Sequence, residues 1–120
     1  MPTILCVDDS SMIRNLMTQI LTKEGHVVLT ADDGNSAMEL SRKQAVDLVL
    51  SDVNMPGMNG ISLVAKLRLL EGYQNTPIIM VTTERDEYKK GKSRSVGANG
   101  WLQKPFDKER LMVAVNKYLG

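Results

Sequence analysis

Short apolar runs alternate five times with segments of helical periodicity along this chain. The apolar runs predict buried strands at 3–7, 47–51, 77–82 and 101–103, and the more polar run at 26–31 predicts a strand at an edge of the sheet. The periodic segments predict helices at 11–24, 34–44, 61–71, 86–95 and from a cap at Asp107 onward. Strands that alternate with helices form right-handed βαβ units. The pattern therefore predicts an α/β domain whose parallel sheet carries helices on both faces.

Two of the predicted helices differ strongly in apolar content. The first turns Ile13, Leu16, Met17, Ile20 and Leu21 to one side, and the helix at 86–95 has only Tyr88 and Val96 as apolar anchors. A broad apolar stripe packs a helix firmly onto a sheet, and a helix without one is held weakly. We expect the helix at 86–95 to be the more labile of the two.

Length and composition indicate one domain over residues 1–120, with no second, output domain. The lone cysteine, Cys6, lies within the first apolar run and excludes an intramolecular disulfide framework. No stretch approaches the roughly 20 apolar residues of a membrane span, and the N-terminus lacks a secretory signal pattern. A cytoplasmic protein without a membrane partner is expected.

Charge is nearly balanced overall but unevenly distributed. The net charge is +1, which gives no indication of a nucleic-acid partner. Residues 85–117 carry nine Lys or Arg and four Asp or Glu, whereas the rest of the chain carries six and ten. The chain is therefore basic toward its C-terminal part and acidic elsewhere.

Five polar residues lie at the carboxyl ends of predicted strands: the adjacent Asp8 and Asp9, then Asp52, Thr82 and Lys104. In an open parallel sheet, ligand chemistry collects at the carboxyl ends of the strands. Clustered carboxylates repel one another, and Mg²⁺ with its oxygen ligands relieves that repulsion. Asp52 could then act as a nucleophile toward phosphorus, with Lys104 and Thr82 contacting phosphoryl oxygens.

The motifs around these positions resemble the receiver domain of two-component response regulators, especially the stand-alone chemotaxis type. The matching segments are Val7-Asp8-Asp9-Ser10, Ser51-Asp52-Val53-Asn54-Met55-Pro56-Gly57-Met58-Asn59-Gly60, Met80-Val81-Thr82-Thr83, Gly97-Ala98 and Lys104-Pro105-Phe106. The resemblance spans essentially the whole chain. It implies a doubly wound, flavodoxin-like (βα)5 domain with strand order 2-1-3-4-5.

The resemblance also implies roles at the site. Asp52 is the phosphoacceptor, and Mg²⁺ is bound by Asp9, Asp52 and the backbone carbonyl of Asn54. Asp8 acts on the metal through a water, and Lys104 pairs with the phosphoryl group.

Further positions are implied to control switching and hydrolysis. Thr82 and Trp101 are the switch residues, and Asn54 and Glu84 tune dephosphorylation. The Lys104–Pro105 peptide bond is expected to be cis.

By this resemblance the chain is a phosphorylation-activated signalling switch. A chemotaxis histidine kinase supplies the phosphoryl group. The face formed by the fourth helix, fifth strand and fifth helix then changes shape and controls a partner protein, for which the flagellar motor switch protein is the first candidate. A phosphatase is a further expected partner, and the protein is expected to be a monomer. Its catalysis is limited to its own phosphorylation and dephosphorylation.

Other functions fit parts of the pattern. Within receivers, a phosphate sink or a regulator of a non-flagellar chemotaxis-like pathway stays open. A Mg²⁺-dependent aspartyl-phosphate phosphatase of the haloacid dehalogenase type needs Asp-x-Asp after the first strand, but here the acids are adjacent. A flavodoxin-like cofactor binder needs a phosphate loop where Asp8-Asp9 would repel phosphate.

Overall fold

A computed structural model describes residues 1–119 and contains the ten elements that the sequence predicts, with bounds within two residues of those expected. The strands are β1 (Thr3–Val7), β2 (Val27–Ala31), β3 (Leu48–Ser51), β4 (Ile78–Thr82) and β5 (Gly100–Gln103). The helices are α1 (Ser11–Lys23), α2 (Gly34–Lys43), α3 (Gly60–Leu69), α4 (Glu87–Ser95) and α5 (Lys108–Leu119). Within residues 1–119, no helix has the length and apolar character required to cross a membrane.

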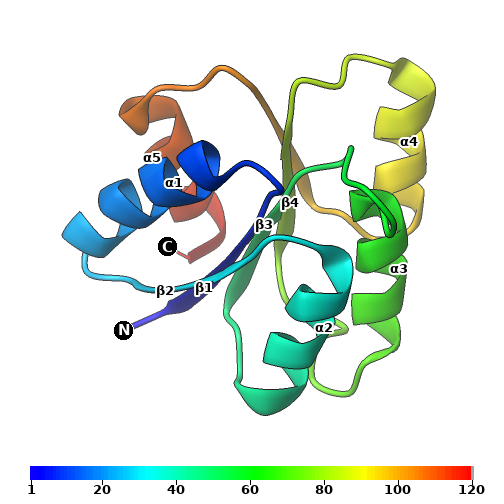
Figure 1. The fold of residues 1–120 in the computed structure, drawn as a ribbon, viewed down its shortest axis with the longest axis horizontal. Helices are drawn as coiled ribbons and strands as arrows, with labels where there is room; N and C mark the ends of the chain where they lie inside the picture. The colour runs from blue at the N-terminus through cyan, green and yellow to red at the C-terminus, as the bar shows by residue number, and fades with distance from the viewer. Residues whose placement is uncertain (120) are drawn as a thin grey trace.

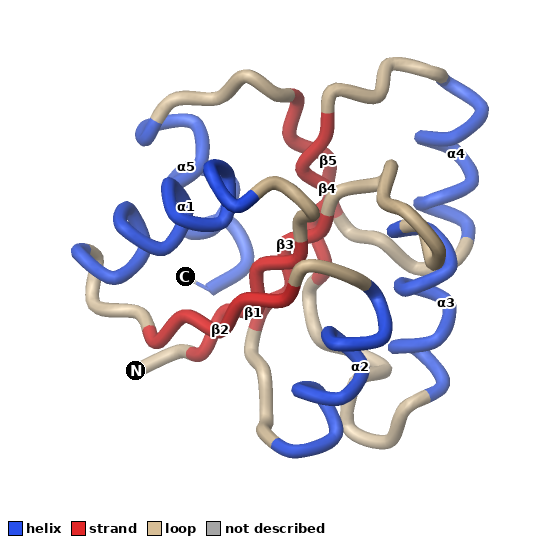
Figure 2. The backbone as a smooth tube through the Cα atoms, viewed as in Figure 1, coloured by secondary structure: helices blue, strands red, loops and turns tan. Residues whose placement is uncertain are grey.

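The five strands form one parallel sheet in the order β2-β1-β3-β4-β5 (Figure 2). β1 pairs with β2 on one side and with β3 on the other, so that Val7 lies opposite both Ala31 and Ser51. The chain order reverses between β1 and β3. Because Val7 and Ser51 are in register, the residues after them, Asp8 and Asp52, leave neighbouring strands at the same level. The strand order expected from the family resemblance is confirmed.

Helices cover both faces of the sheet, with α1 and α5 on one side and α2, α3 and α4 on the other (Figure 1). Alternate residues of each strand point to opposite faces. In β1, Ile4 and Cys6 pack in the cluster under α1 and α5, whereas Leu5 and Val7 pack toward α2 and α3. This two-sided burial explains why the strands read as continuous apolar runs rather than alternating ones.

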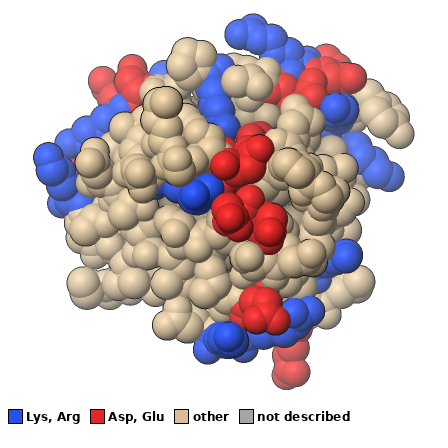
Figure 3. Space-filling view, viewed as in Figure 1, with Lys and Arg blue, Asp and Glu red and all other residues tan. Residues whose placement is uncertain are grey.

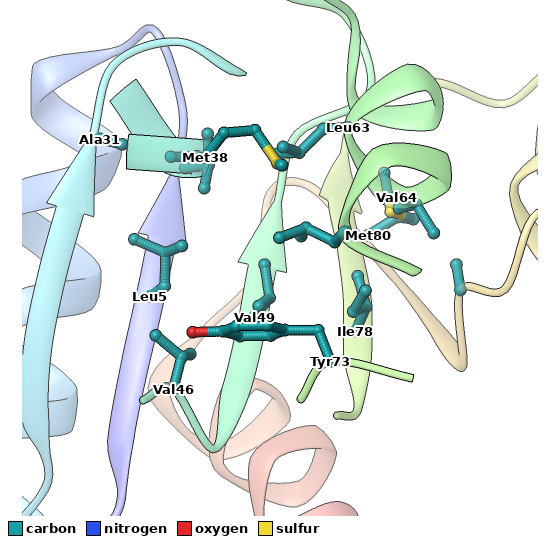
Figure 4. Packing of buried hydrophobic residues seen from close by; sticks show 14 of the residues in the cluster. Leu5, Ala31, Met38, Val46, Val49, Leu63, Val64, Tyr73, Ile78 and Met80 are labelled. Atoms are coloured by element: carbon teal, nitrogen blue, oxygen red, sulfur yellow. The ribbon is translucent and has the colours of Figure 1, made fainter. Parts of the chain in front are cut away.

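Tyr73 closes the core at the amino ends of the strands, on the side of α2 and α3. Its ring lies across Val49 beside Val46 (Figure 4), and 5% of the residue is exposed. The hydroxyl lies 2.7 Å from each of the carbonyl oxygens of Ser41 and Gln44 at the end of α2. Burial raises the pKa of Tyr73. A buried hydroxyl with carbonyl partners therefore ties the segment after α3 to α2.

Two predicted core positions are wrong. Leu16 of α1 is 39% exposed and Tyr88 of α4 is 76% exposed. Met17 and Leu21 occupy the sheet-facing side of α1, which turns Leu16 outward because successive helical residues differ by about 100°. In α4 the buried residue is Ser93, whose hydroxyl donates to the Lys90 carbonyl at 2.8 Å. Helix α4 thus packs on the core with few apolar side chains, which is the feature that led us to expect it to be labile.

Candidate functional site

Three acidic side chains gather where β1 and β3 end. One carboxylate oxygen from each of Asp8, Asp9 and Asp52 lies within 4.8 Å of the other two. Asp8 and Asp52 are buried, at 1% and 8% exposure, and Asp9 is open to solvent. Figure 3 shows acidic side chains in the middle of the face that it draws. Hard oxygen donors at this spacing suit Mg²⁺, and they repel one another when no cation lies between them.

Lys104 reaches this cluster from the end of β5. Its Nζ lies 2.6 Å from Asp8 Oδ2 and 3.2 Å from Asp52 Oδ2, and its side chain is 11% exposed. The Lys104 backbone N–H donates to the Thr82 carbonyl at 2.9 Å, which fixes the start of the lysine side chain against β4. The Lys104–Pro105 peptide bond is cis. One ammonium therefore bridges the two buried carboxylates and offsets part of their charge.

Backbone donors hold the other oxygens of these carboxylates. Asp52 Oδ1 accepts from the N–H of Val53 at 2.7 Å and from that of Asn54 at 3.4 Å. Asp8 Oδ1 accepts from the Ser10 N–H at 2.9 Å. Asp52 thus keeps Oδ1 against the chain and Oδ2 toward the lysine. Metal binding by the Asn54 backbone carbonyl, and by Asp8 through a water, stays a prediction.

Gly60, the first residue of α3, allows the chain after Asp52 to fold back closely. A Cβ at this position would lie 1.9 Å from the Asp52 carbonyl oxygen and 2.8 Å from Met80 Cε. The Gly60 N–H donates to the Val53 carbonyl at 2.8 Å. Only glycine fits this approach, so Gly60 shapes the acceptor loop. It lies in the motif that follows β3, but the sequence reading assigned it no role.

Thr82 and Trp101 lie on neighbouring strands and on the same face of the sheet. Thr82 is paired in register with Gln103, two residues after Trp101. The Thr82 side chain is fully buried, and its Oγ1 accepts from the Glu84 N–H at 3.1 Å. Trp101 is partly buried, and Lys90 Nζ lies 5.8 Å from its ring centroid. A buried hydroxyl and a partly buried indole therefore lie on the same face of neighbouring strands, and the indole faces Lys90 of α4.

Asn54 and Glu84, from two different loops, meet in a hydrogen-bonded group with Lys89 of α4. Asn54 Nδ2 donates to Glu84 Oε1 at 3.0 Å, and Lys89 Nζ donates to the same oxygen at 3.0 Å. Lys89 Nζ also donates to Asn54 Oδ1 at 3.4 Å. The hydrogen bonds from Asn54 and Lys89 lower the pKa of Glu84 to about 2. The sequence marked Lys89 only as one of the basic residues of 85–117, because nothing local indicates which lysine would reach the loops.

The doubly wound parallel sheet thus carries a cluster of three acids and one lysine at the carboxyl ends of its strands. Residues 4–116 match the family described as "Response regulator receiver domain". The chain belongs to this family and is a receiver domain of the two-component and chemotaxis type.

Curated relatives match over nearly their whole length. Protein PilH of Pseudomonas aeruginosa is 38% identical over 99% of this chain and 98% of its own. A chemotaxis protein CheY homolog of Campylobacter jejuni is 39% identical over 98% of this chain and 92% of its own. Sporulation initiation phosphotransferase F of Bacillus subtilis is 34% identical over 97% and 92%.

Solved structures share the fold. Chemotaxis protein CheY4 of Vibrio cholerae superposes with a TM-score of 0.95 at 42% identity, covering 98% of both chains. The receiver domain of sensor histidine kinase PA1611 from Pseudomonas aeruginosa has a TM-score of 0.91 at 26% identity, covering 99% of this chain and 98% of its own. That structure holds a magnesium ion coordinated in the active site cleft.

Proposed function

We propose that this chain is a phosphorylation-activated signalling switch that accepts a phosphoryl group from a histidine kinase onto Asp52. The observation that carries the proposal is the environment of Asp52 Oδ2. That oxygen lies 3.2 Å from the Lys104 ammonium, beside two further carboxylates, while Oδ1 is held by backbone N–H groups. A carboxylate placed in this way is a suitable acceptor for an acyl phosphate.

In the transfer step, Asp52 Oδ2 attacks the phosphorus of the kinase's phosphohistidine. A P–O bond to Asp52 forms as the P–N bond breaks, and the electron pair of that bond stays on the imidazole nitrogen, which takes a proton from solvent. Lys104 lies where it can pair with an oxygen of the transferred group. The Thr82 hydroxyl is the donor for another oxygen.

Mg²⁺ is the proposed cofactor, and the donor set fits it. Asp9 and Asp52 would hold the ion by their carboxylates, Asn54 by its backbone carbonyl, and Asp8 through a water. When bound, the ion neutralises charge on the phosphoryl oxygens. The magnesium-bound receiver domain of the PA1611 kinase supports this assignment.

We further propose that phosphorylation draws Thr82 toward the phosphoryl group and that Trp101 moves into the space that Thr82 vacates. The face of α4, β5 and α5 then changes shape, as a two-state equilibrium biased by a covalent charge. A flagellar motor switch protein is the proposed target, which the chemotaxis relatives support. The sporulation phosphotransferase relative supports the alternative of a phosphate sink or non-flagellar relay.

The proposed setting is a cytoplasmic monomer that acts only on its own phosphoryl group. A histidine kinase donates that group, a phosphatase accelerates its loss, and neither nucleic acid nor membrane is a partner. The alternative function from a different class of protein is a Mg²⁺-dependent aspartyl-phosphate phosphatase. Multiple turnover of a phosphate ester would support that alternative.

The test is intact mass after incubation with Mg²⁺ and a small phosphodonor. We expect one transient phosphoryl group on the wild-type protein and none on Asp52→Asn. A stable absence of adduct on the wild type, under conditions that trap short-lived acyl phosphates, would overturn the proposal. An adduct of equal yield on Asp52→Asn would place the acceptor elsewhere.

A further inference from the structure

Lys89 connects α4 to the loops that follow β3 and β4. It is the third residue of α4, and its side chain is 44% exposed. Its Nζ donates to Glu84 Oε1 and to Asn54 Oδ1, while Asn54 donates to Glu84. The three side chains therefore form a closed ring of hydrogen bonds.

The Glu84 carboxylate has no acceptor site left over. Oε1 accepts from Asn54 and Lys89, and Oε2 accepts from the N–H groups of Arg85 at 3.2 Å and Asp86 at 3.1 Å. An ionised carboxylate offers about four lone-pair sites, and all four are used here. Glu84 is therefore an anchor for its neighbours and has no lone pair to offer an attacking water.

Lys89 lies near the N-terminus of α4, where helices do not favour a positive charge. A cation in the first turn faces the positive end of the helix dipole. The 3.0 Å ion pair with Glu84 offsets that cost and gives the ammonium a defined direction. Lys90, the next residue, points instead to the Trp101 ring. Lys89 is thus directed toward Asn54 and Glu84, and its neighbour toward the switch residue Trp101.

We propose that Lys89 is a positioning residue for hydrolysis of the phosphoryl group on Asp52, and that it acts through the side-chain amide of Asn54. This inference rests on the proposed function. Lys89 only donates hydrogen bonds and the Glu84 carboxylate only accepts them, so together they fix which end of the amide carries oxygen and which carries nitrogen.

The fixed amide keeps one Nδ2 hydrogen and one Oδ1 lone pair free, and these can orient a water. That water attacks phosphorus, a new P–O bond forms, and the P–O bond to Asp52 breaks. The electron pair returns to the Asp52 carboxylate, and the water's proton leaves with the released phosphate or to solvent. Lys89 sets the lifetime of the phosphorylated state by holding the amide in the orientation that directs this water.

The test compares Lys89→Met with Lys89→Arg and with Lys92→Met, an exposed lysine on the same helix. Each protein is phosphorylated with a small phosphodonor and Mg²⁺, the donor is removed, and loss of the phosphoryl group is followed by intact mass. Loss of one charge-assisted hydrogen bond predicts about fivefold slower hydrolysis in Lys89→Met. Lys89→Arg should restore most of the rate, and Lys92→Met should match the wild type. The rate of phosphorylation should be unchanged in Lys92→Met.

A second readout uses the unphosphorylated protein. The NMR signals of the Asn54 side-chain amide should shift in Lys89→Met and not in Lys92→Met. Unchanged amide signals, an unchanged or faster hydrolysis rate in Lys89→Met, or an equal effect of Lys92→Met would each overturn the role of Lys89. A wild-type protein that takes no phosphoryl group would instead refute the proposed function, and the amide signals would still decide whether Lys89 holds Asn54.

Discussion

Lys104 Nζ lies 2.6 Å from Asp8 Oδ2, although the two residues are 96 positions apart in the chain. Both groups are almost fully withdrawn from solvent, with side-chain exposures of 11% and 1%. A contact of this kind is costly to break from one side, because the remaining charge is left buried without its partner. The lysine therefore has a structural role in the metal-free protein as well as its proposed role toward phosphate.

Lys104→Met should lower the free energy of unfolding of the metal-free protein by about 3 kcal/mol. The reason is that Asp8 and Asp52 would then face each other without the ammonium between them. Urea unfolding in the presence of a chelator measures the change. Lys108→Met is the matched control, because its ammonium is 3.8 Å from Glu24 on the surface. A loss no larger than that of the control would contradict this prediction.

Mg²⁺ should raise the Tm of the wild-type protein, because its proposed site, the acid cluster, exists only in the folded chain. At a concentration about 100 times its dissociation constant, it should add about 2.7 kcal/mol to the unfolding free energy. Asp9→Asn should raise the metal-free Tm by about 2–4 °C through reduced repulsion, and should remove most of the response to Mg²⁺. Calorimetry with and without Mg²⁺ checks both. Glu71→Gln, at an exposed site, should keep the full response.

Gly60→Ala should both destabilise the protein and prevent phosphorylation. The added Cβ would lie 1.9 Å from the Asp52 carbonyl oxygen, so the acceptor loop must shift. We expect a loss of about 2 kcal/mol or more. Gly91→Ala, where a Cβ meets nothing within 4 Å, should instead stabilise the exposed helix α4 by about 0.5–1 kcal/mol. Equal behaviour of the two variants in urea unfolding would refute the close-approach argument.

Trp101 is the only tryptophan, so its fluorescence reports on the switch. Beryllium fluoride with Mg²⁺, as a phosphoryl mimic, should change its emission by moving the indole into the space that Thr82 vacates. Thr82→Ala should lose most of this change, because the buried hydroxyl can no longer follow the phosphoryl group. Thr83→Ala, at the exposed neighbouring position, should respond as the wild type does. An emission spectrum unaffected by the mimic would exclude movement of Trp101.

Cys6 should be unreactive in the folded protein. It is fully buried, and desolvation together with the nearby Asp8 raises the pKa of its thiol from 9.0 to about 12. Iodoacetamide at pH 8 should label the urea-unfolded chain rapidly and the native chain only as it opens. Rapid stoichiometric labelling of the native protein would show that the thiol is accessible.

The same shift predicts a pH dependence of stability. Because the folded pKa lies above the unfolded one, the contribution is full below pH 9 and is lost as pH rises toward 12. Between pH 8 and 10.5, wild type should therefore lose more unfolding free energy than Cys6→Ala, which has no thiol to ionise. Parallel losses in the two proteins would contradict the shifted pKa.

Periodicity predicted the fold well because it is a local property. Every strand and helix lies within two residues of its expected bounds. Leu16 and Tyr88 were wrongly predicted to be buried. For an apolar residue near the edge of a helix's apolar stripe, the local sequence does not indicate whether the side chain will face the sheet. The strand order came from the family resemblance, since nothing in the apolar pattern orders parallel strands.

The sequence by itself determined which residues follow each buried strand, and so which acids, hydroxyl and ammonium meet at one edge of the sheet. That follows from chain direction, because all strands of a parallel sheet end at the same edge. Only the tertiary structure decided how these groups pair: Lys104 with Asp8 and Asp52, and Lys89 with Glu84 and Asn54. Apart from Lys89 with Glu84, which lie five positions apart, those contacts join segments far apart in the chain. Their distances depend on the strand register and helix placement that folding sets.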